Sequence, residues 1–442
     1  MSIELDNKSL LVKFAHGLGL NVLLRLKGVI FVPILVNYLD KSDIGTIALI
    51  QSLSGLFLGL VILNLPDSAN KYVLRSDETT QSTIIRYIIT FCLVSAIVSA
   101  IAIFFFNRIA NYKPDVIALF LCLMLVAKVI NKLGVFSFQI FQKTALLVKN
   151  SVFVEYGALI AVVIMAFTGS LNGFQEVLWV QIGFTLIGSV YLLFKCLDQF
   201  PSPRRKLSFD KGPLFKTGLF LLPSLYCFWL IQNSDFIIAE YYLGSEALGE
   251  YSFAYSLGNL VTGLSAAVTF FWYSTAVKAD EQRLRNIFSK VSFYFLIISM
   301  MCMAFFLFAT LPIIDLINSD YRVAYRLVNI LIGGFLLNIL IQVLSGLYYA
   351  NHQEQNILVA WILGAVLNVI LNVLFIPKLG LSWAAFSTLI SFFVVAIVLL
   401  FRSINIHRGV YGTKSKVLLV SGVALCLAYG FFSYFELYNK WI

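Results

Sequence analysis

Apolar stretches of similar length follow one another along almost the whole chain. A helix rises about 1.5 Å per residue, so about 20 apolar residues cross the hydrocarbon core of a bilayer. Such stretches lie at 14–38, 44–65, 84–106, 116–139, 147–168, 177–197, 215–240, 248–275, 286–310, 325–350, 355–376 and 381–401, and a further one lies at 416–435. The pattern predicts an all-α integral membrane protein with twelve spans and an extra C-terminal apolar segment.

The composition agrees with this interpretation. Of the 442 residues, 60% are hydrophobic and 12% are charged, which is far from the balance of a soluble domain. The connections are too short to hold a soluble catalytic or nucleotide-binding domain, and no nucleophile elbow or H-E-x-x-H motif occurs. We therefore expect no catalytic residues, no metal site and no enzymatic activity.

The positive charges are distributed unevenly between the two sets of connections. The N-terminus and every second connection carry seventeen lysines and arginines, whereas the alternate connections and the C-terminal tail carry six. The positive-inside rule therefore predicts a multi-pass protein with a cytoplasmic N-terminus. The net charge of +10 belongs mostly to the cytoplasmic rim, where we expect contact with membrane lipids and none with nucleic acid.

The chain has the features of two related halves. Residues 38–56 and 242–260 align without a gap and share six of nineteen residues, among them Gly45 with Gly249. We predict an N-terminal six-helix bundle at 1–197, a cytoplasmic linker at 198–214 and a C-terminal six-helix bundle at 215–401, around a central cavity. Residues 402–442 would form a cytoplasmic loop and the extra apolar segment, which either spans the membrane or lies at its surface.

Cations lie inside the apolar stretches of the first half. In the first span Asn21 and Arg25 share a helical face, whereas Lys27 points about 200° away from Arg25 and is expected to snorkel. In the fourth span Lys128, Asn131 and Lys132 form one stripe. Since a cation at mid-membrane is costly, this spacing predicts a cationic lumen suited to a phosphate group.

The alternative is structural. Lys132 would snorkel, and Glu155 in the fifth span would pair with one of the other cations and cancel its charge.

The second half offers uncharged polarity and one buried acid. Asn338 and Gln342 share a face of the tenth span, where they either bind sugar hydroxyls or hold helices together. Asp235 lies within the seventh span. A carboxylate at that depth predicts either a structural role or coupling to H⁺ or Na⁺, and Glu155 is a second candidate for coupling. We expect no cofactor beyond such an ion.

Three longer segments resemble one family. YLDKSDIG and ALIQSLSG after the first span, NSDFIIAEYYLGSEALGEYSFAYSL at 233–257, and LNVILNVLFIPKLGLSWAAFSTLISF at 367–392 resemble bacterial Wzx-type polysaccharide flippases of the multidrug/oligosaccharidyl-lipid/polysaccharide exporter (MOP) superfamily. Members usually have twelve or fourteen spans, so the thirteenth apolar segment is a departure from the family pattern.

The resemblance implies a MATE-like inner-membrane transporter that moves undecaprenyl-diphosphate-linked oligosaccharide repeat units of O-antigen or another surface polysaccharide to the periplasmic leaflet. It implies that Arg25 contacts the diphosphate and that Lys128 and Lys132 line the same lumen. A polysaccharide polymerase and a chain-length regulator would be partners.

Two other functions compete with this interpretation. A multidrug or cation antiporter of the same superfamily would need acidic residues in the N-terminal cavity, where this chain has Arg25 and Lys128. A polysaccharide polymerase would need a large external loop, whereas the longest external connection here has about fourteen residues.

Overall fold

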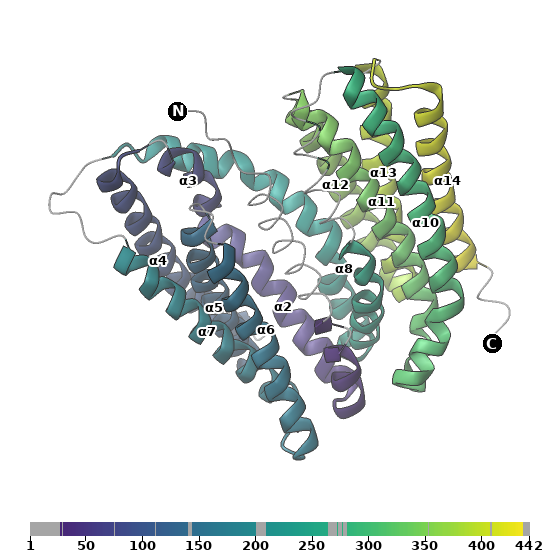
Figure 1. Ribbon diagram of the computed structural model, residues 1–442. Helices are drawn as coiled ribbons and strands as arrows, with labels where there is room; N and C mark the ends of the chain where they lie inside the picture. The colour runs from purple at the N-terminus through teal and green to yellow at the C-terminus, as the bar shows by residue number, and fades with distance from the viewer. Residues whose placement is uncertain are drawn as a thin grey trace. The chain divides into compact units, whose positions relative to one another are not determined.

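The computed structural model describes residues 27–28, 30–74, 76–110, 112–139, 144–199, 209–263, 272, 276, 281–351, 353–406 and 409–435. These residues are almost entirely helical, and none of them forms a strand. The helices of the first part are α2 (Lys41–Ile62), α3 (Leu65–Val73), α4 (Glu78–Ala110), α5 (Asp115–Gln139), α6 (Thr144–Phe167) and α7 (Phe174–Gln199). They are followed by α8 (Gly212–Gly258), α10 (Glu281–Ile317), α11 (Ala324–Ala350), α12 (Glu354–Leu379), α13 (Leu381–Ile406) and α14 (Thr413–Phe435), with short 3₁₀ helices η1 (Asn259–Thr262) and η2 (Ser319–Tyr321) (Figure 1).

Eleven of these helices are long and apolar enough to cross a membrane. They coincide with the predicted spans, except that the stretches at 14–38 and 248–275 lie partly outside the described residues. The all-α membrane class is therefore confirmed. The thirteenth apolar segment is also one of these helices, because α14 is 23 residues long with a mean hydropathy of 1.9.

The chain folds into two compact units. Of the described residues, unit 1 contains Lys27 and Thr46–Tyr226, and unit 2 contains Gly28–Gly45 and everything from Cys227 onward. The boundaries expected from the sequence at 198–214 and 402 stay predictions.

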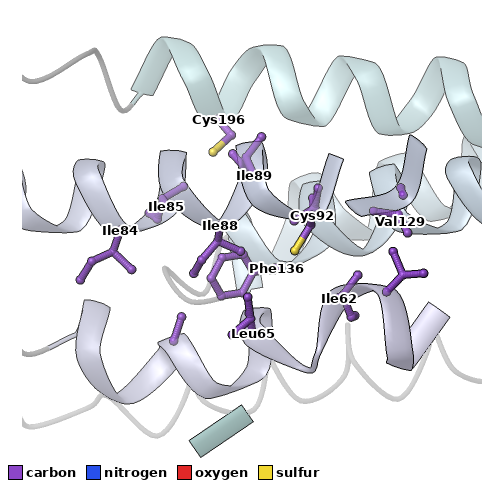
Figure 2. Packing of buried hydrophobic residues seen from close by; sticks show 14 of the residues in the cluster. Ile62, Leu65, Ile84, Ile85, Ile88, Ile89, Cys92, Val129, Phe136 and Cys196 are labelled. Carbon is purple, nitrogen blue, oxygen red and sulfur yellow. The ribbon is translucent and has the colours of Figure 1, made fainter. Parts of the chain in front are cut away.

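Unit 1 is built around a cluster of buried hydrophobic residues shared by α2, α3, α4, α5, α7 and the start of α8. Figure 2 shows its centre, where isoleucines of α4 meet Leu65 of α3, Val129 and Phe136 of α5, and Cys196 of α7. Val129 and Phe136 recur at helical spacing, so one face of α5 is committed to this core. The polar stripe of α5 occupies the face beside this one.

Unit 2 is built around α11. Almost every residue of α11 from Leu327 to Leu347 is buried, as expected of a helix that is apolar on all sides and surrounded by others. Helices α10, α13 and α14 pack against it. Small residues allow close packing where apolar lipid offers no hydrophobic drive for helix association, and Gly333 of α11 faces the backbone of α14 at Cys426 and Gly430. Helix α14 is thus an integral member of unit 2.

The two copies of the internal repeat meet in unit 2. Helix α8 is interrupted at Gly244, whose φ of 87° is in the region that favours glycine, and a new helical segment starts at Ser245. This start packs against the start of α2: a Cβ on Gly45 would overlap the carbonyl oxygen of Ser245, and one on Gly249 would overlap that of Lys41. Since Lys41 and Ser245 are equivalent in the repeat, the two contacts are reciprocal.

Candidate functional site

Helix α5 places a lysine among neutral oxygen atoms within unit 1. The Nζ of Lys128 donates to the carbonyl oxygen of Gln51 at 2.7 Å and to the Oγ of Ser54 at 2.7 Å, both on α2. Its neighbour Val129 lies in the hydrophobic core, so the packing of α5 fixes the direction of the lysine. The ammonium group of Lys128 is therefore solvated by neutral dipoles, and neither of these two partners is a carboxylate.

Lys128 lines a cavity of about 370 Å³ that lies wholly within unit 1. The lining comes from residue 27 and from α2, α5, α6 and α7, and it consists of Lys27, Gln51, Met124, Lys128, Asn131, Val154, Glu155, Ala158, Gln181 and Thr185. Gln51 donates from Nε2 to the Oε1 of Gln181 at 3.0 Å across this wall. Amide, hydroxyl and ammonium groups in one pocket can together bind a polar anionic ligand.

Lys27 is a member of this site that the sequence interpretation missed. We expected it to snorkel, but its Nζ lies 2.5 Å from the Oε2 of Glu155, and the two side chains are 17% and 38% exposed. The sequence did suggest Glu155 as a partner for a cation of this half. The signal that could have found the pair was that Lys27 and Glu155 both lie within apolar stretches, where a charge needs a partner.

The other predicted residues of the first half are placed differently. Asn131 lines the cavity beside Lys128. Lys132 points to α3 and pairs with Asp67 at 2.9 Å, and it is absent from the described lining of this cavity. Arg25 and Asn21 lie outside the described residues.

Asp235 of α8 is fully buried in unit 2. Its Oδ2 accepts hydrogen bonds from the hydroxyls of Tyr251 at 2.5 Å and Thr388 at 3.1 Å, and its Oδ1 accepts one from the N–H of Phe236 at 3.0 Å. All three donors are neutral. The buried carboxylate therefore has polar partners in the described part of the chain but no paired cation among them.

A network of amides and hydroxyls lies beside this acid. The Oδ1 of Asn368 accepts from Ser234 at 2.7 Å and from Asn372 at 3.1 Å, and Ser387 donates to Asn372. Ser234 adjoins Asp235 in the sequence, so the acid and the network occupy the same part of α8. Sequence reasoning noted Asn368 and Asn372 only as part of the segment at 367–392 that carries the family resemblance, and it did not place them near Asp235.

Asn338 and Gln342 lie on the central helix α11. Asn338 is buried, and its Oδ1 has no hydrogen-bond partner among the described residues, whereas Gln342 is half-buried and takes part in polar contacts. Neither residue belongs to the cavity that Lys128 lines.

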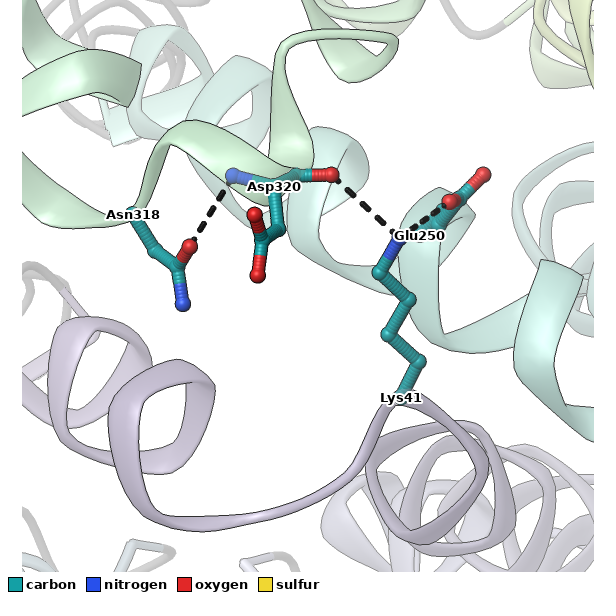
Figure 3. A network of polar contacts seen from close by, with 4 residues as sticks. All are labelled: Lys41, Glu250, Asn318 and Asp320. Atoms are coloured by element: carbon teal, nitrogen blue, oxygen red, sulfur yellow. Dashed lines mark hydrogen bonds and ion pairs between the residues drawn. The ribbon is translucent and has the colours of Figure 1, made fainter.

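A second polar cluster in unit 2 joins the starts of the two repeat copies to η2. The ammonium of Lys41 lies 2.6 Å from Glu250 and 3.3 Å from the carbonyl oxygen of Asp320, while Asn318 accepts from the N–H of Asp320 at 3.0 Å (Figure 3). A pocket of about 430 Å³ is lined by Lys41, Asn318 and Asp320, and it also reaches Glu246. The cluster is rich in acids, in contrast to the cavity in unit 1.

Two family models together match nearly the whole chain. The one described as "Polysaccharide biosynthesis protein" matches residues 13–273, and the one described as "Lipid II flippase MurJ" matches residues 266–441. No curated protein sequence matches the chain.

Solved structures resemble the chain over most of its length. Lipid II flippase MurJ in an inward closed conformation is 14% identical, with a TM-score of 0.73 over 97% of this chain and 98% of that chain. An inward-facing MATE family multidrug resistance transporter of the MOP superfamily is 13% identical, with a TM-score of 0.66 over 91% and 96%. A MOP superfamily transporter from Pyrococcus furiosus, described for the reverse polarity of its binding pocket, is 11% identical, with a TM-score of 0.53 over 97% and 97%. The predicted MATE-like fold is confirmed.

Proposed function

Because the chain belongs to the polysaccharide biosynthesis protein family, we propose that it is a flippase for undecaprenyl-diphosphate-linked oligosaccharide repeat units. It moves these precursors of O-antigen or another surface polysaccharide from the cytoplasmic to the periplasmic leaflet. It acts in the bacterial inner membrane with its N-terminus in the cytoplasm, and it delivers its cargo to a polysaccharide polymerase and a chain-length regulator.

The observation that carries this proposal is the charge of the cavity in unit 1. Lys128 is held by two neutral oxygen atoms at 2.7 Å each, so its charge is available to a ligand. A diphosphate linkage carries a negative charge on each phosphate, and an ammonium group binds phosphate as a point charge. The amides of Gln51, Asn131 and Gln181 can bind further oxygen atoms of the ligand.

A multidrug or cation antiporter is the second candidate, supported by the likeness to a MATE family transporter. A cationic drug would need an acid with no cation of its own. In the described lining of the unit 1 cavity, the one acid is Glu155, and Lys27 already neutralises it. The charge of the cavity therefore favours an anionic cargo.

Transport against a gradient needs an energy source, and we assign ion coupling to Asp235 in preference to Glu155. Asp235 is fully buried and has only neutral hydrogen-bond donors around it. Its charge can therefore be neutralised by H⁺ or Na⁺, whereas that of Glu155 is already balanced by Lys27.

The test measures in which leaflet the lipid-linked repeat unit accumulates. Cells lacking the protein would be complemented at matched expression with wild type, Lys128→Gln or Lys195→Gln, a control at an exposed lysine outside the cavity. Loss of a charge-assisted contact worth about 1.5–3 kcal/mol would slow flipping at least about tenfold in Lys128→Gln. The control would match wild type.

The proposal fails if the repeat unit reaches the external leaflet equally well without the protein. If the cells then become sensitive to cationic drugs, the antiporter would be the better interpretation.

A further inference from the structure

Charge is balanced unequally among Lys27, Lys128 and Lys132 of unit 1. Lys132 is paired with Asp67 at 2.9 Å and Lys27 with Glu155 at 2.5 Å, while Lys128 is held by neutral oxygen atoms. The Lys27–Glu155 pair lies in the cavity wall, whereas Lys132 and Asp67 are absent from its described lining. The pair in the wall is therefore the one that a ligand in the cavity can reach.

The exposure of the pair shows which partner is more accessible. Lys27 is 17% exposed, so it needs a counter-charge at all times, since a half-buried ammonium without one is costly. Glu155 is 38% exposed, so its carboxylate has room to turn away into the cavity. A carboxylate oxygen and a phosphate oxygen accept the same charge-assisted hydrogen bond from an ammonium group.

Resting on the function proposed above, we propose that Glu155 is an internal competitor of the cargo. Its carboxylate holds the ammonium of Lys27 before the cargo binds, and a phosphate group of the cargo then replaces it there. The second phosphate then binds Lys128, so the two ammonium groups match the two phosphates of the linkage.

The displaced carboxylate has a definite effect on affinity and selectivity. It stays beside the bound phosphate and repels it, which weakens binding. A carrier must bind its cargo strongly enough to accept it and weakly enough to release it, and Glu155 sets that balance. A free phosphate ion lacks the sugar and lipid contacts of the cargo, so it competes poorly with the carboxylate already in place.

The experiment measures binding of inorganic pyrophosphate to the full-length protein in detergent by calorimetry. Wild type is compared with Lys128→Gln, with Glu155→Gln and with Glu176→Gln, the last being the same substitution at an acid of α7 outside the described lining of the cavity. We expect Glu155→Gln to bind pyrophosphate at least about tenfold more tightly and Glu176→Gln to bind it as wild type does.

Removal of Glu155 alone leaves Lys27 without its carboxylate and can destabilise the protein. The double variant Lys27→Gln/Glu155→Gln removes both charges, and it is compared with Lys27→Gln in a double-mutant cycle. If Glu155 competes for Lys27, Glu155→Gln strengthens pyrophosphate binding only while Lys27 is present. The double variant should then bind pyrophosphate as tightly as Lys27→Gln does. A purely structural Glu155 would lower the melting temperature without tightening binding.

The outcomes separate the two proposals. If Glu155→Gln binds pyrophosphate no more tightly than wild type, Glu155 does not compete with the cargo. If Lys128→Gln at the same time binds pyrophosphate more weakly than wild type, the proposal that the cavity binds an anionic cargo still holds. If neither wild type nor Glu155→Gln binds pyrophosphate, both the competitor and the proposed anionic cargo are overturned.

Discussion

A charged group inside a membrane helix has to be stabilised by something that the rest of the chain supplies. In unit 1 the partners come from other helices: α2 supplies neutral oxygens to Lys128, α3 supplies Asp67 to Lys132, and α6 supplies Glu155 to Lys27. These partners give the lysines different roles. Only a lysine whose charge is uncancelled, or whose partner can be displaced, is able to bind an anionic ligand.

The first residue-scale prediction concerns Asp235. In Asp235→Asn the charge that an ion would neutralise is gone, so flipping in vesicles should no longer respond to an imposed H⁺ or Na⁺ gradient. The measurement is the flipping rate of wild type and variant with and without the gradient. Asp315→Asn is the control, because Asp315 pairs with Arg322 at 2.5 Å in an exposed position. An Asp235→Asn protein that still follows the gradient would rule out this residue as the coupling site.

The second residue-scale prediction concerns the carboxylate before α4. Hydrogen bonds from Thr79 and Thr80 lower the pKa of Asp77 to about 2, and the side chain caps the first turn of α4. Because the folded pKa lies below the unfolded value of about 3.9, the carboxylate contributes stability above about pH 4 and loses it as the pH falls toward 2.

The control for this prediction is Asp77→Asn, which keeps a capping side chain without the charge. The melting temperature of wild type should exceed that of Asp77→Asn at pH 6, and the difference should shrink as the pH falls below 4. A difference that is constant between pH 6 and pH 3 would show that ionisation of Asp77 does not stabilise the helix start.

At the scale of elements, the reciprocal crossing of α2 and α8 makes a prediction about two glycines. A Cβ at Gly45 or Gly249 would overlap a backbone carbonyl, which no side-chain rotation relieves. Each alanine substitution should therefore destabilise the protein by about 1–3 kcal/mol, the usual cost of overpacking. Gly183→Ala in α7 is the control, since a Cβ there meets nothing within 4 Å and alanine favours a helix by about 1 kcal/mol.

Thermal unfolding in detergent measures all three variants. The symmetry of the crossing predicts similar losses for Gly45→Ala and Gly249→Ala. If both were as stable as Gly183→Ala, the two helix starts would not be in close contact.

The hydropathy of the sequence was sufficient to predict the long membrane-spanning helices, but not which polar side chains pair between them. The predicted spans at 44–65 and 116–139 correspond to α2 and α5, because apolar length alone determines which segments can cross a bilayer. The short helix α3 was missed, since its polar sequence resembles a loop. The partner of Lys27 was missed because it lies 128 residues away, and a helical wheel shows direction within one helix only.

At the scale of the whole molecule, the two units are interleaved along the sequence. The chain changes unit after Lys27, after Gly45 and after Tyr226. Residues 28–45 therefore belong with the second part of the chain, although a simple division into halves would give them to the first. The weak repeat between 38–56 and 242–260 had suggested two separate halves, whereas its two glycines, Gly45 and Gly249, meet within unit 2.

The last prediction concerns the side of the membrane on which the chain ends. Helix α14 is a member of the unit 2 bundle: Tyr429 donates a hydrogen bond to Asn329 of α11, and Gly430 packs against Leu389 of α13. Its 23 residues are enough to cross the bilayer, and the apolar side chains of Val417 and Phe435 near its two ends are exposed. If the N-terminus is cytoplasmic, as proposed above, and α14 is a thirteenth span after the twelve expected from the sequence, the C-terminus lies in the periplasm.

Alkaline phosphatase is active only in the periplasm, so its fusion after residue 442 should be active, while a fusion after residue 406, before α14, should be inactive. A fluorescent protein that folds only in the cytoplasm should give the opposite pair of results. If both fusion points reported the cytoplasm, α14 would not cross the membrane. Helix α14 would then have to contact α11 and α13 without crossing the membrane, although its 23 residues are enough to do so.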